Sequence, residues 1–284
     1  DGIRDSVASR GLGDVYKRQP EDYVYEGLAM LQQNKPKVAV NLFKKALKSD
    51  PKNTSALYNQ GLALNQMRKY QDAITCFDKV IEIDPKDAPS YNNRAISLAE
   101  LGDTDEALEW YDKSIKIDPK YAAAHYNKGV LLDKKLRPDE ALECLDEAIK
   151  LEPKKDNPRF YKGIVLGKMK KHEESLNCFQ NVYRHNKHHL DAYFQTGVQL
   201  AELERHEQAV KVFDSIMEKH EKFRNNANVI YAKSRSKAAL DQTGEALELL
   251  RIAIKQSKGI KQWALKEKVF EKFFGTPEFE DIIK

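Results

Sequence analysis

Apolar residues in this chain recur at the three- and four-residue spacing of α-helices, in pairs of segments separated by a short polar turn. Within residues 88–121 the first segment reads SYNNRAISLAELG and the second reads TDEALEWYDKSIKID. Gly102 is a helix stop, and Asp103 and Thr104 then supply an N-cap. Pro119 ends the second segment, because the residue before a proline is disfavoured in the α conformation. The pattern predicts a helix–turn–helix.

This helix pair repeats with a fixed period. The stretch IEIDPKDAPSYNNRA begins at Ile81, and IKIDPKYAAAHYNKG begins thirty-four residues later at Ile115. Prolines recur at the same interval, at Pro51, Pro85, Pro119 and Pro153. A period in the range of about 20–50 residues is typical of stacked units that each contact only their neighbours. The chain is therefore predicted to be an all-α solenoid.

Alignment on the prolines divides the chain into six equal units, a degenerate seventh and two flanking segments. The units span residues 20–53, 54–87, 88–121, 122–155, 156–189, 190–223 and 227–258. Residues 259–284 carry Trp263, Phe270 and Phe274 on one helical face, and we interpret them as a capping helix that covers the last unit. Residues 1–19 share nothing with the repeats and lack an initiator Met, so we interpret them as a disordered, non-native scar.

Three positions, counted from the start of each unit, predict how the two helices pack. The eighth is small, with Gly27, Gly61, Ala95, Gly129, Gly163, Gly197 and Ser234. The twentieth is also small, with Ala39, Ala73, Ala107, Ala141, Ser175, Ala209 and Ala246. The twenty-fourth is bulky, with Phe43, Phe77, Tyr111, Leu145, Phe179, Phe213 and Leu250. Glycine inside a helix destabilises it, so we expect the backbones to cross most closely where positions 8 and 20 face each other.

These columns resemble the tetratricopeptide repeat (TPR), a helix–turn–helix of 34 residues with proline at position 32. The resemblance extends from Pro20 to about Lys258, although Lys187 and Glu221 replace the proline in two units. It implies a right-handed α-solenoid whose first helices line a concave groove. It also implies a non-enzymatic scaffold or adaptor that binds a peptide or a partner protein in that groove. The pattern leaves the identity of the partner open.

In each first helix, positions 4, 8 and 11 are predicted to face the second helix, so positions 2, 5, 6, 9, 12 and 13 form the opposite face. We call these six positions the first-helix stripe. Its amide and aromatic side chains are the candidate binding residues: Tyr58, Asn59, Asn92, Asn93, Tyr126, Asn127, Phe160, Phe194 and Gln195. Because amides both donate and accept hydrogen bonds, a row of them can satisfy a peptide backbone. The sequence predicts that these side chains are exposed and not needed for folding.

One binding mode of the family is not expected here. Members that bind the acidic C-terminal tails of chaperones place lysine at position 5 and asparagine at position 9. In this chain position 5 never holds lysine, and position 9 holds only apolar residues in the six regular units. Those members also place an arginine at position 6, whereas the basic residues Arg94 and Lys128 of this chain lie at position 7. We therefore expect no chaperone tail to bind through such a carboxylate clamp.

The cysteines and histidines do not predict catalysis or metal binding. Cys76, Cys144 and Cys178 share position 23 with Leu, Trp and Val of other units, which indicates an apolar packing site. Three unpaired thiols favour a reducing compartment, so we expect a cytoplasmic protein. His185, His188 and His189 place two imidazoles on one face if their segment is helical, but the equivalent segments read as turns. No cofactor, metal or enzymatic activity is expected, because no Ser–His–acid, phosphate-loop or HExxH pattern is present.

Charge and hydropathy leave two alternatives open. The net charge of +4 is small beside 48 basic and 44 acidic residues, and lysines alternate with glutamates, so nucleic-acid binding is not the expected function. Lysine-rich turns such as KMKKHEE keep a nucleic-acid-associated protein as one alternative. The second alternative is that the chain is the regulatory arm of a longer enzyme. No apolar run of eighteen residues is present, so no membrane contact is expected.

The predicted register can be tested at Ala141 and Glu143. Ala141→Leu places a large side chain where the two helices cross, so it should destabilise the fold by about 1–3 kcal/mol. Glu143→Leu lies on the predicted outer face and should be nearly neutral. Thermal unfolding of both variants measures the difference. Equal midpoints would show that the register is wrong.

Overall fold

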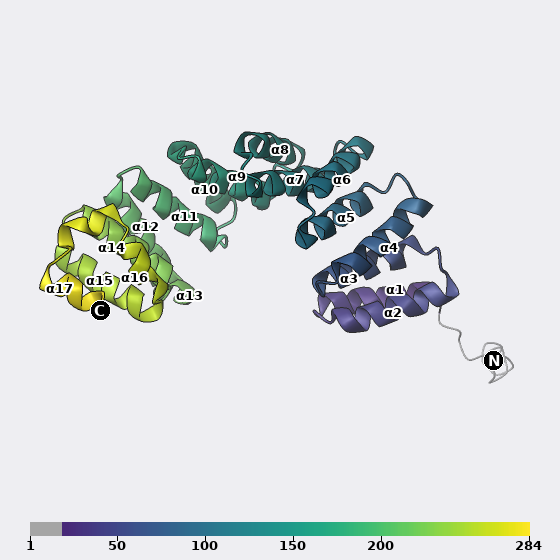
Figure 1. The fold of residues 1–284 in the computed structure, drawn as a ribbon, viewed down its shortest axis with the longest axis horizontal. Helices are drawn as coiled ribbons and strands as arrows, with labels where there is room; N and C mark the ends of the chain where they lie inside the picture. The colour runs from purple at the N-terminus through teal and green to yellow at the C-terminus, as the bar shows by residue number, and fades with distance from the viewer. Residues whose placement is uncertain (1–18) are drawn as a thin grey trace, which may run out of the picture. The chain divides into compact units, whose positions relative to one another are not determined.

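The computed structural model describes residues 19–284, and within that range it consists of helices and turns without a strand (Figure 1). The prediction of a non-native segment at 1–19 falls outside the described residues except for Gln19, which is the N-cap of the first helix. The long helices are α1 (Pro20–Gln32), α2 (Pro36–Ser49), α3 (Thr54–Gln66), α4 (Tyr70–Ile83), α5 (Ala88–Leu101), α6 (Thr104–Ile117), α7 (Ala122–Lys134), α8 (Pro138–Leu151), α9 (Asp156–Lys168), α10 (His172–His185), α11 (Leu190–Glu202), α12 (His206–Lys219), α14 (Ala227–Ala239) and α15 (Thr243–Gln256). Four short elements complete the chain: α13 (Glu221–Arg224), α16 (Gly259–Ala264), the 3₁₀-helix η1 (Lys268–Phe273) and α17 (Pro277–Ile282).

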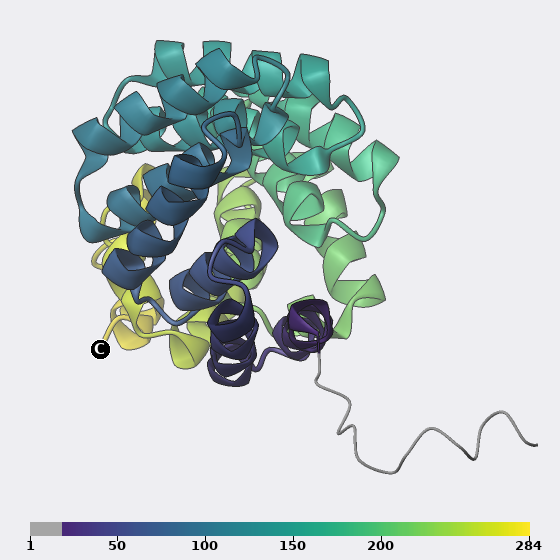
Figure 2. The ribbon, with the colours of Figure 1, turned by 90° about the vertical axis from the view of Figure 1, so that its right-hand side faces the viewer.

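The chain divides into two compact units, an N-terminal unit that ends at Leu131 and a C-terminal unit that starts at Leu132. In the N-terminal unit α1 packs on α2, α3 on α4 and α5 on α6 (Figure 2). In the C-terminal unit α9 packs on α10, α11 on α12 and α14 on α15. Within each unit the second helix of one pair also contacts the first helix of the next pair, as α4 contacts α5 and α10 contacts α11. Each unit is therefore a stack of helix pairs, as the repeat predicts.

In four of the described helix pairs an aromatic ring of the second helix lies against a glycine of the first. A Cβ added to Gly61 would lie 2.6 Å from the ring of Phe77, and one added to Gly197 would lie 2.6 Å from the ring of Phe213. The rings of Phe77 and Phe213 are fully buried. The small residue at position 8 therefore makes room for the bulky residue at position 24. Position 8 therefore faces the bulky residue at position 24 as well as position 20.

Positions 8 and 20 also approach each other, as predicted. The Ser175 hydroxyl at position 20 donates a hydrogen bond to the Gly163 carbonyl at position 8, over 2.7 Å. In the last pair the roles are reversed, and the Ser234 hydroxyl donates to the Ala246 carbonyl at 2.7 Å. These two serines are fully buried, so the bonds satisfy hydroxyls that have lost water. The backbones are thus close enough for a serine side chain to bridge them.

Neighbouring pairs are linked by a repeated ion pair. A basic residue at position 7 of one repeat contacts an aspartate at position 25 of the preceding repeat. The four pairs are Arg94 Nε–Asp78 Oδ1 at 2.6 Å, Lys128 Nζ–Asp112 Oδ1 at 2.5 Å, Lys162 Nζ–Asp146 Oδ1 at 2.5 Å and Lys233 Nζ–Asp214 Oδ1 at 2.6 Å. Each aspartate is partly exposed, so the stabilisation by each pair is modest, at most about 1 kcal/mol. These ion pairs determine which side chains of neighbouring repeats face each other.

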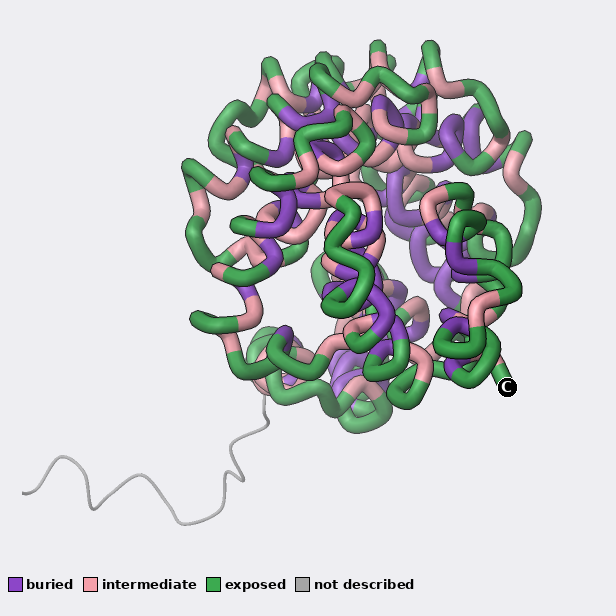
Figure 3. The backbone as a smooth tube through the Cα atoms, turned by 90° about the vertical axis from the view of Figure 1, so that its left-hand side faces the viewer, coloured by how far each residue is buried: buried purple, intermediate pink, exposed green. Residues whose placement is uncertain are grey.

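The turns inside the helix pairs require a left-handed residue. Gly102 ends α5 with φ of +99°, which confirms the predicted helix stop. The corresponding turns elsewhere use residues other than glycine, including Arg68 and Leu136, both with φ of +58°. Asp103 follows Gly102 as the N-cap of α6. Buried residues concentrate where helices meet and the turns are exposed (Figure 3).

The C-terminal segment covers the last helix pair, but as three short helical elements instead of the single helix predicted. Phe270, Phe273 and Phe279 are buried in the same cluster as Leu250 of α15. The single amphipathic face does not form, because the backbone is extended at Glu267 and left-handed at Gly275. As a result Trp263 is 53% exposed and Phe274 is 41% exposed, whereas Phe270 is fully buried.

None of the helices that the structure describes combines the length and apolar character needed to cross a membrane.

Gly197→Ala tests the glycine–ring contact. The added methyl group collides with the buried Phe213 ring, so the free energy of unfolding should fall by about 1–3 kcal/mol. Gly244→Ala is the matched control, because nothing lies within 4 Å of a Cβ at Gly244 in the first turn of α15. Alanine there should be neutral or stabilising by up to about 1 kcal/mol. Urea unfolding followed by circular dichroism compares the two, and an equal loss in both variants would refute the packing role of Gly197.

Candidate functional site

The asparagines of the first-helix stripe form a hydrogen-bonded ladder in the N-terminal unit. The Asn93 amide donates to the Tyr58 hydroxyl at 2.9 Å and to the Pro89 carbonyl at 2.9 Å. The Asn127 amide donates to the Asn92 side-chain oxygen at 2.9 Å. In both cases position 6 of one repeat bonds to position 5 of the preceding repeat. The ladder therefore joins neighbouring repeats.

This arrangement corrects the prediction that the stripe is exposed and not needed for folding. Asn92 is 3% exposed and Asn93 is 8% exposed, so both amides lie inside the stack. Asn59 differs, because its amide donates to the Ser55 carbonyl one turn earlier in the same helix, at 2.8 Å. The sequence could not show which asparagines join two repeats and which bond within their own helix. The same residue type at the same position faces a different neighbour in each repeat.

The aromatic residues at position 5 also take part in folding. Tyr58 makes an edge contact with Phe77, with ring centroids 5.9 Å apart. Phe160 makes the same edge contact with Phe179, at 5.4 Å, and the Phe194 ring lies tilted against Phe213, at 6.0 Å. Burial raises the pKa of Tyr58 to about 12 and also raises the pKa of Tyr126. These rings are half-buried anchors, so each presents at most one side to a partner.

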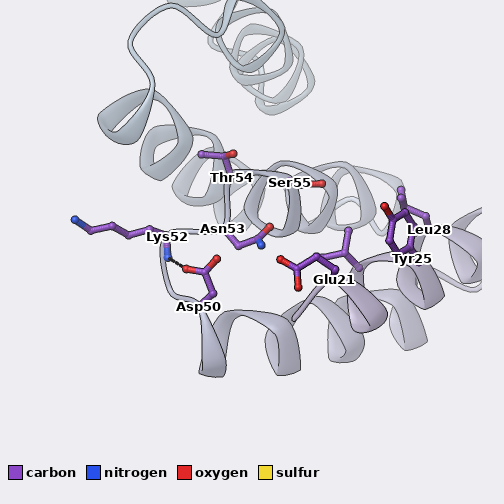
Figure 4. Close-up of a pocket in the computed structure, with 9 residues that line it drawn as sticks. Glu21, Tyr25, Leu28, Asp50, Lys52, Asn53, Thr54 and Ser55 are labelled. Atoms are coloured by element: carbon purple, nitrogen blue, oxygen red, sulfur yellow. Dashed lines mark hydrogen bonds between the residues drawn. The ribbon is translucent and has the colours of Figure 1, made fainter. Parts of the chain in front are cut away.

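Hollows lie on the first-helix stripe in both units, and two of them, one in each unit, are lined by apolar residues at position 9. The first has a volume of about 470 Å³ and lies between α1 and α3 (Figure 4). Val24 and Leu28 line it from α1 together with Tyr25, whose side chain is 72% exposed. Glu21 and Asn53 point toward one another across it, and the Asn53 side chain also caps α3 by accepting from the Ala56 amide at 2.9 Å. The hollow thus combines apolar walls with polar groups.

The second hollow lies between α9 and α11 in the C-terminal unit and has a volume of about 570 Å³. Ile164 and Val198, both at position 9, line it together with Gln195, which the sequence had indicated. His172 hydrogen-bonds to the Gln199 side chain at 2.9 Å across one part of its wall. Its lining is mixed: the three apolar side chains Ile164, Phe179 and Val198 lie among six polar or charged ones.

A buried carboxylate lies beside the second hollow. Asp133 is 5% exposed and accepts hydrogen bonds from the Tyr161 hydroxyl at 3.0 Å and from Lys168 Nζ at 2.6 Å. Lys168 also lines the hollow, and its side chain is 59% exposed. The lysine is therefore held in place by Asp133 while most of it stays in contact with solvent.

Of the predicted site residues, Gln195 lines a hollow, whereas Asn92, Asn93 and Asn127 lie in the ladder. Tyr25, Leu28, Ile164 and Val198 were missed. The signal for three of these residues was present, since position 9 is apolar in each regular repeat. The same apolar column is also the reason why no carboxylate clamp is expected. An apolar column on the stripe predicts the floor of a groove.

The histidine segment has local structural roles. His189 accepts a hydrogen bond from the Ala192 amide at 3.2 Å and so caps α11, and its ring lies 4.7 Å from the Phe160 ring. His185 Nδ1 lies 3.0 Å from Asp156 Oδ1. Between residues 19 and 284 no group of three or more His, Cys, Asp or Glu is placed to hold a metal ion.

The cysteines lie in packed surroundings and none forms a disulfide. Cys76 is buried, and Cys144 and Cys178 are half-buried. Burial raises the pKa of the Cys76 thiol to about 11 and also raises the pKa of Cys178. A raised pKa keeps the thiol protonated at neutral pH and lowers its reactivity.

Family models match much of this helix stack. The model described as "Tetratricopeptide repeat" matches residues 54–87 and 122–155, and related models of the same repeat match 76–109, 97–135 and 191–222. A comparison with curated protein sequences finds no match.

Solved structures share the fold. YrrB, described as a TPR protein with an unusual peptide-binding site, is 27% identical, with a TM-score of 0.56 over 64% of this chain and 92% of its own. A thermophilic TPR protein of Thermus thermophilus is 19% identical, with a TM-score of 0.57 over 64% of this chain and 99% of its own. A tetratricopeptide repeat protein of Parabacteroides merdae is 17% identical, with a TM-score of 0.59 over 93% of this chain and 97% of its own.

Stacked helix pairs with a glycine against an aromatic ring define an α-helical repeat protein of the solenoid class. The chain is a tetratricopeptide-repeat protein. Repeats of this type act in general as protein-interaction scaffolds.

Asn93→Ala tests the ladder. The change removes the donor to the Tyr58 hydroxyl and to the Pro89 carbonyl in a buried place, so unfolding should become easier by about 1–3 kcal/mol. Asn59→Ala is the control, because it removes only a bond within one helix turn and should cost about 0.5 kcal/mol or less. Chemical denaturation of both variants gives the comparison. If Asn59→Ala proves as costly as Asn93→Ala, the ladder does not stabilise the stack.

Proposed function

We propose that this chain is a non-enzymatic scaffold or adaptor that binds an extended segment of a partner protein along the first-helix stripe. The observation that carries the proposal is the position of the two hollows. Each lies between the first helices of consecutive repeats, and their apolar residues come largely from the stripe, with position 9 contributing to both. Within each unit, a hollow that lies between the first helices of successive repeats suits a short extended segment of a ligand.

The chemistry of the hollows suits a peptide. Leu28 and Val24 in one hollow, and Ile164 and Val198 in the other, offer apolar contact to side chains. Gln195 and Ser55 lie beside them and can bond to a peptide backbone without selecting one sequence. A recurring apolar contact flanked by hydrogen-bonding groups is how extended peptides are commonly held.

The exposed ring of Tyr25 supports a binding role for the first hollow. Tyrosine at 72% exposure leaves a large apolar surface in water, and aromatic residues are enriched where proteins bind each other. The position 5 aromatics Tyr58, Phe160 and Phe194 contribute differently, since they are fixed by contacts with the second helices. We infer that they give the stripe a rigid shape, which lowers the entropy lost on binding.

The basic residues at position 7 support a partner other than an acidic chaperone tail at this stripe. Arg94 is paired with Asp78 and Glu106, and Lys128 is paired with Asp112. Their charges are thus engaged between repeats and do not converge on the stripe. A cytoplasmic location remains part of the proposal, in keeping with three cysteines that form no disulfide.

The double variant Tyr25→Ala/Gln195→Ala tests the proposal. Neither substitution removes a buried group, so melting should stay close to that of the wild type. Capture of partner proteins from a native lysate should fall about tenfold or more, because truncating an aromatic interface anchor often costs about 2 kcal/mol. The captured proteins are quantified by mass spectrometry.

The matched control is Leu136→Ala/Gln71→Ala, which removes one exposed apolar side chain and one exposed amide side chain outside both hollows. It should retain the captured proteins. Full capture by the Tyr25/Gln195 variant together with loss in this control would show that the stripe is not the binding surface.

A further inference from the structure

Two equivalent grooves lie on the C-terminal unit, away from the two hollows of the first-helix stripe. The α8–α10 groove is lined by residues of α8, α9 and α10, and the α10–α12 groove by residues of α10, α11, α12 and the turn at Lys187. The two grooves are built largely from the same repeat positions, one repeat apart. They can therefore be compared residue by residue.

The α8–α10 groove is narrow and carries balanced charges. Lys162 crosses it to Asp146, with Nζ and Oδ1 2.5 Å apart, and Glu174 also lines it. Its volume is about 260 Å³. The ion pair between Lys162 and Asp146, which joins neighbouring repeats, thus closes this groove.

The α10–α12 groove has lost that ion pair. Gln180 stands where the preceding repeat has Asp146, Thr196 stands in place of Lys162, and Gln208 in place of Glu174. Thr196 is too short to cross the groove, and its hydroxyl donates to the Ala192 carbonyl of its own helix at 2.9 Å. The volume rises to about 420 Å³. The substitutions both open the groove and remove its acidic residues.

An aromatic pair and three cations line the opened groove. Tyr183 and Tyr193 are stacked, with centroids 4.1 Å apart and planes inclined by 8°. Lys187 Nζ lies 4.5 Å from the centroid of the Tyr183 ring, and Lys187 stands where most repeats carry proline. Arg184 and Lys211 are exposed on either side, and no Asp or Glu lines the groove among the described residues.

We propose that the α10–α12 groove is a second binding site, for an acidic extended segment of a partner protein. The argument is charge complementarity, since three cations without a facing carboxylate attract an anionic ligand. Gln180 and Gln208 offer amides to its backbone, and the stacked tyrosines offer an apolar contact.

A peptide is favoured over a nucleic acid because the basic patch is short. Asp146 and Glu174 line the adjacent groove, and Asp214 and Glu218 follow on α12. Binding to a phosphate backbone depends on a track of cations that neutralises several phosphates. Here acidic residues interrupt any such track on both sides.

The experiment measures fluorescence anisotropy of the full chain with a fluorescein-labelled peptide in which glutamates alternate with phenylalanine and alanine. Arg184→Glu/Lys211→Glu should weaken binding about tenfold or more, because two facing cations become anions. Gln180→Asp/Thr196→Lys restores the residues of the neighbouring groove without changing the net charge. It should weaken binding to a similar extent by closing the groove.

Lys154→Glu/Lys219→Glu is the matched control, since it changes the net charge equally at exposed lysines outside the groove. It should keep the wild-type affinity within about twofold. The proposal is overturned if the wild-type chain shows no saturable peptide binding, or if the control weakens binding as much as Arg184→Glu/Lys211→Glu.

A labelled single-stranded oligonucleotide that binds more tightly and loses affinity in the same two groove variants would instead identify a nucleic-acid site. All of these variants leave both hollows of the first-helix stripe intact, so a negative result does not bear on the function proposed for the stripe.

Discussion

The contact between a glycine in the first helix and a buried aromatic ring in the second sets the geometry on which the other interactions depend. At Gly27, Gly61, Gly163 and Gly197 any added Cβ would lie within 3 Å of a phenylalanine ring. Helices this close have no room for adjustment, because protein interiors are packed as densely as organic crystals. The distance and rotation within a pair are thereby fixed. The first-helix stripe always faces away from the second helix as a consequence.

Contacts between pairs then determine which parts of that stripe remain available. In the N-terminal unit the asparagine ladder uses the amides of Asn93 and Asn127 to join repeats. The ion pairs between positions 7 and 25 do the same on another face. Groups used in this way are not free to bind a partner. The hollows and the α10–α12 groove occur where these contacts are absent or replaced by shorter side chains.

Repeats that stabilise the stack thus differ from repeats that can bind a partner. The repeat from 156 to 189 departs from the common pattern at Gln180 and Lys187, and the next repeat departs at Thr196. The loss of the ion pair at this junction lowers local stability slightly, while the groove becomes wider and is lined by Arg184, Lys187 and Lys211. A repeat protein tolerates this loss because each unit depends only on its neighbours. Binding surfaces can therefore arise at one junction without changing the others.

The sequence by itself determined the fold, because the evidence for it is repeated along the chain. The 34-residue period, the small residue at position 8 and the bulky residue at position 24 each occur in successive units, so they predicted the helix pairs found from α1 to α15. The sequence also indicated Gln195, which lines a hollow. Only the tertiary structure decided that Asn92 and Asn93 are buried, that Tyr25 is exposed and that the C-terminal segment is broken into three elements. The physical reason is that periodicity reports the face of a helix, whereas burial depends on which side chain of the next repeat meets that face.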